Sequence, residues 1–200
     1  MSQTVGFISA NEVALRALTP RVAGANNPVL IEDETLTDLS FLGLPSLRDA
    51  NENDKISLLA TQFIGNPADG SNPANGVWGV TAPLPDIGVL LPSEVQEIQT
   101  LLATANGAIA GSVPEGWALF DLHGLYNEVV TTGVFEDDFN MSGDLVFGGC
   151  FSLDGFNPTS RGSALIAKRM LEAIDATYGS NLSEAGLEIG DYPTNYPDGI

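Results

Sequence analysis

The sequence predicts a mixed α/β fold. In the second half, short apolar runs suited to strands alternate with amphipathic segments suited to helices, an order typical of layered α/β proteins. The first half is less regular, with brief apolar runs between turn-rich stretches. The chain has 200 residues, of which 44% are hydrophobic and 16% charged, a composition of folded proteins rather than disordered ones. We expect a single α/β domain over residues 1–182 and an acidic tail over residues 183–200.

The elements expected in the first half are short. Apolar residues between 13 and 22 indicate a brief helix, which the turn residues of 24–27 end. The run Pro-Val-Leu-Ile at 28–31 predicts a buried strand, and a second apolar run covers 56–60. Between 65 and 92 the composition shifts to Gly, Asn, Pro and Ser, which predicts a long irregular loop.

A long helix is predicted from Ser93. Ser93 and Gln96 fit a capping box, and apolar residues then recur at intervals of three and four as far as Ile109. After a turn, the apolar run 117–122 is suited to a strand covered on both faces. A brief helix over 125–130 should follow and stop at Gly133.

The last predicted helix runs from about Thr159 to Tyr178. Ile166 and Met170 are expected on its inner side, and Gly179 follows its end as a stop signal. The final twenty residues are rich in Asp, Pro and Asn, which predicts an unpacked tail.

The charge of the chain excludes several classes of partner. Against 26 acidic residues stand only 7 Lys and Arg, so the net charge is −19. Nucleic acid and anionic membranes would repel such a surface. No apolar run is long enough to span a membrane, and the first residues have neither the basic nor the apolar region of a signal peptide. The residues leave the localisation open.

The single cysteine, Cys150, excludes an internal disulfide and a multi-cysteine zinc site. It lies in the apolar stretch Phe-Gly-Gly-Cys-Phe at 147–151. A small buried thiol is the favoured interpretation, and a reactive nucleophile is the alternative.

The single histidine, His123, follows Asp121 by two residues. Because strand side chains alternate, the two can point the same way and form an acid–base pair that serves a serine such as Ser152 or Ser163. The alternative, which we favour, is structural: Asp121 caps a helix and His123 lies in its first turn.

A segment from Asp138 matches the first half of a calcium loop. Oxygen-bearing side chains recur at alternate positions, namely Asp138, Asn140, Ser142 and Asp144, and a glycine occupies the sixth position. The twelfth position is Gly149 instead of the bidentate glutamate of such loops. A plain acidic turn is therefore favoured over a calcium site.

The segment 148–167 reads Gly-Gly-Cys-Phe-Ser-Leu-Asp-Gly-Phe-Asn-Pro-Thr-Ser-Arg-Gly-Ser-Ala-Leu-Ile-Ala. It resembles the last motif block of the SGNH, or GDSL-type, serine acylhydrolases, in which Asp-x-x-His-Pro precedes a small residue, a glycine and an amphipathic helix. The resemblance covers about residues 28–182 and is to the C-terminal half of a bacteroidete-type subset of these lipase-like proteins. It implies a partial or shortened flavodoxin-like three-layer fold, action on an ester-type small molecule or lipid, and no cofactor.

Two departures from the family pattern limit what the resemblance implies. Asp154 matches the triad aspartate, but Asn157 stands at the position of the catalytic histidine, and an amide cannot take a proton from a serine. The Gly-Asp-Ser-Leu nucleophile motif and the Gly-x-Asn-Asp block have no match. We therefore expect a fragment or an inactive relative of an ester hydrolase, exported by analogy with the family and able to form homo-oligomers.

A hypothesis from another class is a non-enzymatic acidic binding or structural module. In that case the aromatic residues of the loops, among them Trp78 and Phe156, would line a groove for a ligand or partner.

Overall fold

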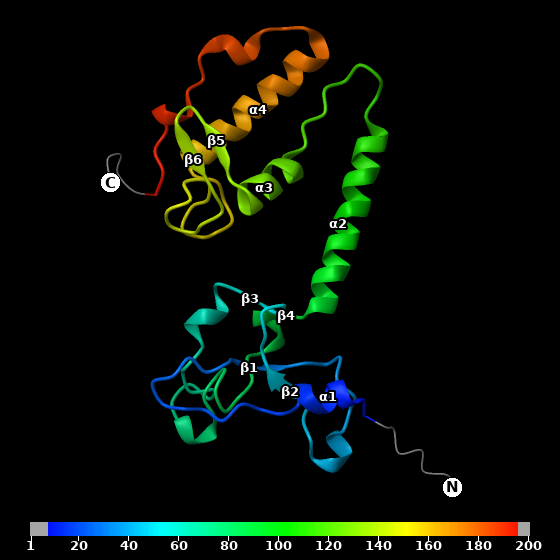
Figure 1. Ribbon diagram of the computed structural model, residues 1–200, viewed down its shortest axis with the longest axis vertical. Helices are drawn as coiled ribbons and strands as arrows, with labels where there is room; N and C mark the ends of the chain where they lie inside the picture. The colour runs from blue at the N-terminus through cyan, green and yellow to red at the C-terminus, as the bar shows by residue number, and fades with distance from the viewer. Residues whose placement is uncertain (1–7, 196–200) are drawn as a thin grey trace. The chain divides into compact units, whose positions relative to one another are not determined.

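The computed structural model describes residues 8–195, and the chain divides between Thr104 and Ala105 into two compact units (Figure 1). Each unit combines helices with short strands, so the mixed α/β class is confirmed. All named strands belong to two-stranded antiparallel sheets. The parallel sheet expected at the centre of a three-layer fold is not found among residues 8–195, where parallel pairing is limited to isolated bridges.

The first unit is built on two small sheets. In one, β1 (Leu30–Glu32) pairs with β2 (Leu47–Asp49), and in the other β3 (Lys55–Ile56) pairs with β4 (Val89–Leu90). Leu84 adds a parallel bridge to Ile31 at the open side of β1. The core beneath these strands consists of Ile31, Ala60, Leu84, Val89 and Leu91. Of the run 28–31, which predicts a strand, Leu30 and Ile31 lie in β1. Of the apolar run 56–60, only Ile56 lies in a strand.

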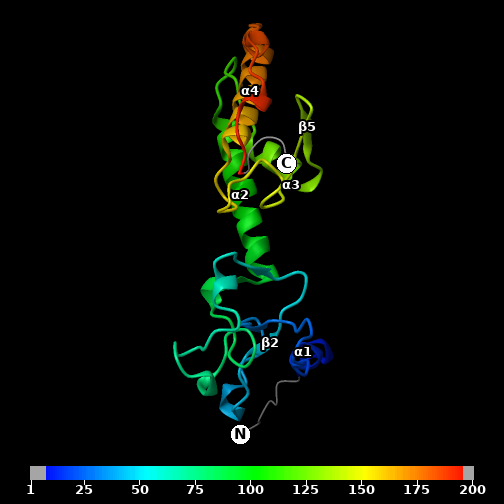
Figure 2. The same cartoon turned by 90° about the vertical axis from the view of Figure 1, so that its left-hand side faces the viewer.

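Loops and single helical turns make up most of the first unit, as both views show (Figures 1 and 2). The helix expected between 13 and 22 lies earlier in the chain: α1 spans Ala10–Leu15, is capped by the Ser9 hydroxyl and does not include residues 16–22. Four 3₁₀ turns follow, namely Ser40–Leu42, Ala60–Gln62, Pro73–Asn75 and Asp86–Gly88. The predicted irregular loop 65–92 is thus interrupted by two of these turns and by β4.

A buried ion cluster ties the loops of the first unit to β2. The guanidinium of Arg48 donates from Nε to Asp33 at 2.5 Å and from both terminal nitrogens to Asp54 at 2.6 Å. All three side chains are buried. Burial alone would raise the pKa of Asp33, but hydrogen bonds from Arg48 and Thr35 outweigh it and lower the pKa. The cluster joins the turn after β1 to the turn after β2.

We predict that Arg48→Met unfolds the first unit more readily, because two buried carboxylates then lose their counter-ion. Removing one partner of a buried ion pair costs about 3–5 kcal/mol. Urea denaturation of the full chain measures the effect, with the exposed Lys55→Met as the matched control. Equal stability of the two variants would contradict the prediction.

The long helix α2 (Pro92–Ser112) begins one residue earlier than expected. The predicted capping box is replaced by a different arrangement, in which Glu94 accepts a hydrogen bond of 2.7 Å from the amide of Leu91. Pro92 in the first turn needs no hydrogen-bond partner for its nitrogen. None of the residues of α2 is buried. Within residues 8–195, none of the helices has the length and apolar character needed to cross a membrane.

The second unit packs two helices and a hairpin around one core. Helix α3 (Leu122–Thr131) begins three residues earlier than expected and stops before Gly133, and β5 (Val134–Glu136) pairs with β6 (Phe139–Met141). Helix α4 (Ser160–Tyr178) ends at Gly179 as predicted. The core is formed by Leu125, Val129, Val134, Met141, Cys150, Phe151, Ala164, Leu165 and Ile189. On α4 the buried residues lie in the first turns, whereas Met170, expected inside, is exposed.

The predicted strand over 117–122 is not formed. Its residues pair with no other strand among residues 8–195, and the amide of Ala118 instead donates to the hydroxyl of Tyr178. Trp117 is 67% exposed, so the run is not covered on both faces. An apolar run becomes a strand only where a neighbouring strand can pair with its backbone.

The hairpin turn between β5 and β6 is stabilised by hydrogen bonds from other segments of the second unit. Both turn residues, Asp137 and Asp138, have positive φ angles, of 46° and 66°. A two-residue hairpin turn of type I′ requires positive φ at both positions. The Asp137 carboxylate accepts a hydrogen bond from Lys168 at 2.5 Å and one from the amide of Ile189 at 2.9 Å. These contacts join the turn to α4 and to the C-terminal segment.

The prediction of an unpacked tail is wrong for residues 182–195. Two 3₁₀ turns, Leu182–Ala185 and Ile189–Asp191, follow α4, and Ile189 is fully buried in the core. Arg161 on α4 donates from Nε to the carbonyl of Tyr192 at 3.0 Å. The guanidinium of Arg161 also lies 4.0 Å from the ring centre of Phe139. Residues 196–200 of the expected tail lie outside the described residues.

We predict that Ile189→Ala destabilises the second unit by about 2–5 kcal/mol, the usual cost of emptying a buried isoleucine site. Leu182→Ala, at an exposed position of the same segment, should have little effect. Thermal unfolding of the two variants makes the comparison. A tail that only lies on the surface would leave both variants as stable as the parent chain.

Candidate functional site

A closed loop between Phe151 and Pro158 contains both residues that the family resemblance assigns to the triad. The backbones of Phe151 and Pro158 form an antiparallel bridge at its base. The amide of Ser152 donates to the carbonyl of Asn157 at 2.7 Å, and the amide of Gly155 donates to the carbonyl of Ser152 at 2.9 Å. Gly155 has a φ of 69°, a conformation that favours glycine, so it allows the loop to turn back.

The Asp154 carboxylate organises this loop. It accepts hydrogen bonds from the Ser152 hydroxyl at 2.6 Å, from the amides of Phe156 and Asn157 at 2.8 Å, and from the Asn157 side chain at 2.7 Å. These bonds, the Ser152 hydroxyl first, hold the pKa of Asp154 well below its usual range, although the residue is exposed. Asp154 is therefore a poor proton acceptor for the serine beside it.

The side chain of Asn157 contacts Asp154 directly. Its amide nitrogen donates a hydrogen bond of 2.7 Å to Asp154. A neutral imidazole in this place could donate to the aspartate with one nitrogen and accept a serine proton with the other. The amide of Asn157 can only donate or accept hydrogen bonds, so the pair orients the loop without supplying a base.

The loop is fixed to the start of α4. Thr159 caps the helix by accepting a hydrogen bond of 3.0 Å from the amide of Gly162, and its hydroxyl donates to the carbonyl of Gly149 at 2.6 Å. A Cβ atom at Gly162 would lie only 2.2 Å from the carbonyl oxygen of Cys150. Only glycine allows this approach, which accounts for the glycine at position 162 of this chain.

The structure places His123 and Asp121 in the favoured, structural arrangement. Asp121 caps α3, with its carboxylate accepting a hydrogen bond of 2.8 Å from the amide of Gly124. His123 lies in the first turn, and its ring lies within 3.2 Å of the Asn127 amide nitrogen. Ser152 donates to Asp154 instead, and Ser163 lies in the first turn of α4. Over residues 8–195, no hydrogen bond joins His123 to Asp121 or to either serine.

The four candidate calcium ligands do not all line the same hollow. Asp138 lies in the turn, whereas the other three line a surface hollow of about 340 Å³ next to the end of α3, namely Asn140, Ser142 and Asp144. Ser142 and Asp144 hydrogen-bond to each other at 3.2 Å. A calcium loop wraps its ligands around one point, whereas Asp138 does not line the hollow that the other three share.

Cys150 is buried in the core, and burial raises the pKa of its thiol to about 11. A thiolate is the reactive form of cysteine, so this environment suppresses reactivity. The interpretation of Cys150 as a buried structural thiol fits this position.

One cluster of three carboxylates was not predicted from the sequence. Glu34, Asp86 and Glu94, here called the acidic trio, have carboxylate oxygens within 4.8 Å of one another. Repulsion from Asp86 is the main cause that raises the pKa of Glu34. Three carboxylates at this distance could hold a cation. Their positions are far apart in the chain, so no local pattern indicates that they meet.

Neither the protein-family models, nor the curated proteins, nor the solved structures contain a match to this chain.

We predict that Asp154→Ala opens the loop 152–157, because the amides of Phe156 and Asn157 lose their common acceptor. Their hydrogen exchange should then accelerate, whereas Asp144→Ala, at another exposed aspartate, should leave it unchanged. In the parent chain the protection should persist below a pH of about 3.9, the ordinary pKa of aspartate. The reason is that a lowered pKa keeps the carboxylate charged until the pH falls through the lowered value. Unchanged exchange in Asp154→Ala would contradict this role.

Proposed function

We propose that the chain is the C-terminal part, or a catalytically silent relative, of an SGNH-type carboxylic-ester hydrolase, and that it does not hydrolyse esters by itself. The observation that carries the proposal is the contact of 2.7 Å between Asp154 and Asn157 in the loop that precedes α4. In the motif block that this segment resembles, the same two positions hold the aspartate and histidine of the triad.

The chemistry of the loop supports an inactive chain. Triad hydrolysis needs a base that takes the serine proton and later returns it to the leaving group. At Asn157 no such base is available, and Asp154 is held as an anion by its hydrogen bonds. Loss of a triad base or nucleophile alone lowers turnover by a factor on the order of 10⁶.

A second candidate function, a non-enzymatic acidic binding module, is favoured by the acidic trio in the first unit. This candidate does not depend on the loop 152–157. A chain that has lost its hydrolytic chemistry can serve as such a module, so the two proposals are compatible.

The test is fluorophosphonate labelling of the full chain, read by intact mass, together with an assay of short-chain p-nitrophenyl esters. We predict that neither the parent chain nor Asn157→His takes up label or turns over ester, because a base without a nucleophile motif restores no triad. Asp154→Asn serves as a matched variant of the same loop, and an active serine esterase verifies the reagents.

Uptake of one label with ester turnover by the parent chain would overturn the proposal. The labelled serine would then identify the site, and loss of activity in His123→Ala would assign the base. Labelling of Asn157→His alone would show that the nucleophile is present and that only the base is missing.

A further inference from the structure

An apolar hollow opens on the surface of the first unit. Its volume is about 240 Å³, and it is lined by Ser57, Leu59, Ala60, Phe63, Pro85, Ile87 and Gly88. The large apolar side chains around it face solvent, with Ile87 93% exposed, Leu59 71% and Phe63 53%. Exposed apolar side chains gathered around a hollow mark a place where another molecule binds, whereas isolated ones do not.

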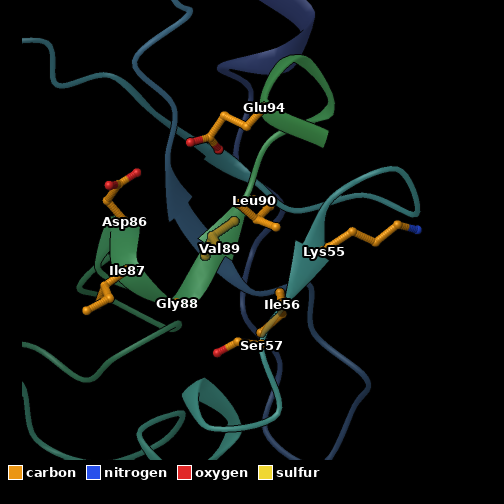
Figure 3. A pocket seen from close by; sticks show the side chains of 9 residues that line it. All are labelled: Lys55, Ile56, Ser57, Asp86, Ile87, Gly88, Val89, Leu90 and Glu94. Carbon is orange, nitrogen blue, oxygen red and sulfur yellow. The ribbon is translucent and has the colours of Figure 1, made fainter. Parts of the chain in front are cut away.

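The apolar hollow continues into one that is lined by charged as well as apolar side chains. A neighbouring hollow of about 410 Å³ shares Ser57, Ile87 and Gly88 with it, and is also lined by Asp86 and Glu94 of the acidic trio. In Figure 3, Asp86 extends toward Glu94, whereas Ile87 extends away from both. One continuous surface thus presents apolar side chains at one end and carboxylates at the other.

The carboxylates of this surface have no counter-ion among residues 8–195. Within the described part of the chain, no ion pair includes Glu34, Asp86 or Glu94. Lys55 lines the same hollow but points away from the two carboxylates drawn in Figure 3. A ligand that brings a positive charge to the trio would relieve this repulsion.

The turn Asp86–Gly88 fixes the two halves of the surface relative to each other. The amide of Gly88 closes the turn on the carbonyl of Pro85 at 2.9 Å. A Cβ atom at Gly88 would lie 2.8 Å from the Cβ of Ala60, so the turn packs closely on the core of the unit. Asp86 and Ile87 are consequently held at neighbouring positions on a well-supported turn, which lowers the entropic cost of binding.

We propose that this surface docks a basic peptide segment of another protein, with an apolar side chain in the hollow of Leu59, Phe63 and Ile87 and a Lys or Arg against the acidic trio. Charge complementarity decides the occupant. A second copy of this chain carries a net charge of −19 and is repelled, as are anionic lipids and nucleic acids. A free metal ion would use the carboxylates but none of the apolar half.

The probe is a phage-displayed library of random dodecapeptides, panned on the full chain. We expect enriched peptides to combine Leu, Ile or Phe with a nearby Lys or Arg. The best of them is then synthesised, and its affinity is measured by fluorescence anisotropy. Failure to enrich any peptide, or enrichment of peptides without this combination, overturns the proposal.

Two variants test the two halves of the surface. Ile87→Ser and Asp86→Asn should each weaken binding of the selected peptide by about tenfold or more, as loss of an anchor residue does. Added salt should weaken binding to the parent chain more than to Asp86→Asn. Phe41→Ser and Glu52→Gln, exposed apolar and acidic positions elsewhere in the unit, are the controls and should bind as the parent chain does.

Three further outcomes would contradict the proposal. If Ile87→Ser binds the selected peptide as tightly as the parent chain does, the peptide binds through charge alone. The apolar hollow is then not a docking site. If Asp86→Asn binds normally with an unchanged salt dependence, the trio is not involved. If sedimentation shows that the chain self-associates and that Ile87→Ser abolishes it, the surface belongs to a second copy. None of these results bears on ester hydrolysis, which the labelling experiment tests separately.

Discussion

The main constraint on both units is the large number of backbone amides that lie outside helices and sheets. The strands are two or three residues long, so their ladders satisfy few backbone groups. Buried amides without partners are costly, and loops must therefore find acceptors elsewhere. Aspartate side chains supply many of them here. Asp154 accepts from two amides of its loop, Asp137 accepts from Ile189, and Asp175 accepts from Leu182 and Ser183 after α4.

This use of aspartate explains part of the acidic composition. A carboxylate that accepts hydrogen bonds is stabilised as an anion, and the pKa values of Asp137, Asp154 and Asp175 are all lowered. Side-chain hydrogen bonds from Lys168, Ser152 and Ser180 respectively contribute most, and the backbone amides add to the effect. Each lowered pKa links folding to pH. The contribution is complete above the pKa of the unfolded chain and is lost as the pH falls through the folded value. The acidic side chains therefore act as internal supports of the loops as well as surface charge.

The sequence predicts those elements whose signals are local. Apolar spacing and the flanking residues Thr159 and Gly179 locate α4, because caps and periodicity act within a few residues. The strand predicted over 117–122 is wrong because apolar character does not reveal whether a neighbouring strand exists. Ile189 is a single apolar residue in a polar segment, so no periodic pattern marks it as part of the core. The acidic trio is assembled by folding from positions 34, 86 and 94, and only the structure reveals it.

The presence of Asp154 in the loop 152–157 is weak evidence for catalysis. Asp154 is needed to close the loop whatever chemistry the chain performs, since it accepts the amides of Phe156 and Asn157. Its presence is therefore compatible with an active, an inactive or a purely structural role. Asn157 is more informative. Its Nδ2 donates to the aspartate, so this hydrogen bond closes the loop without a group that could act as a base. On the proposed ancestry, loss of the base at this position costs the loop none of its contacts, and the fold can persist after the hydrolytic chemistry has gone.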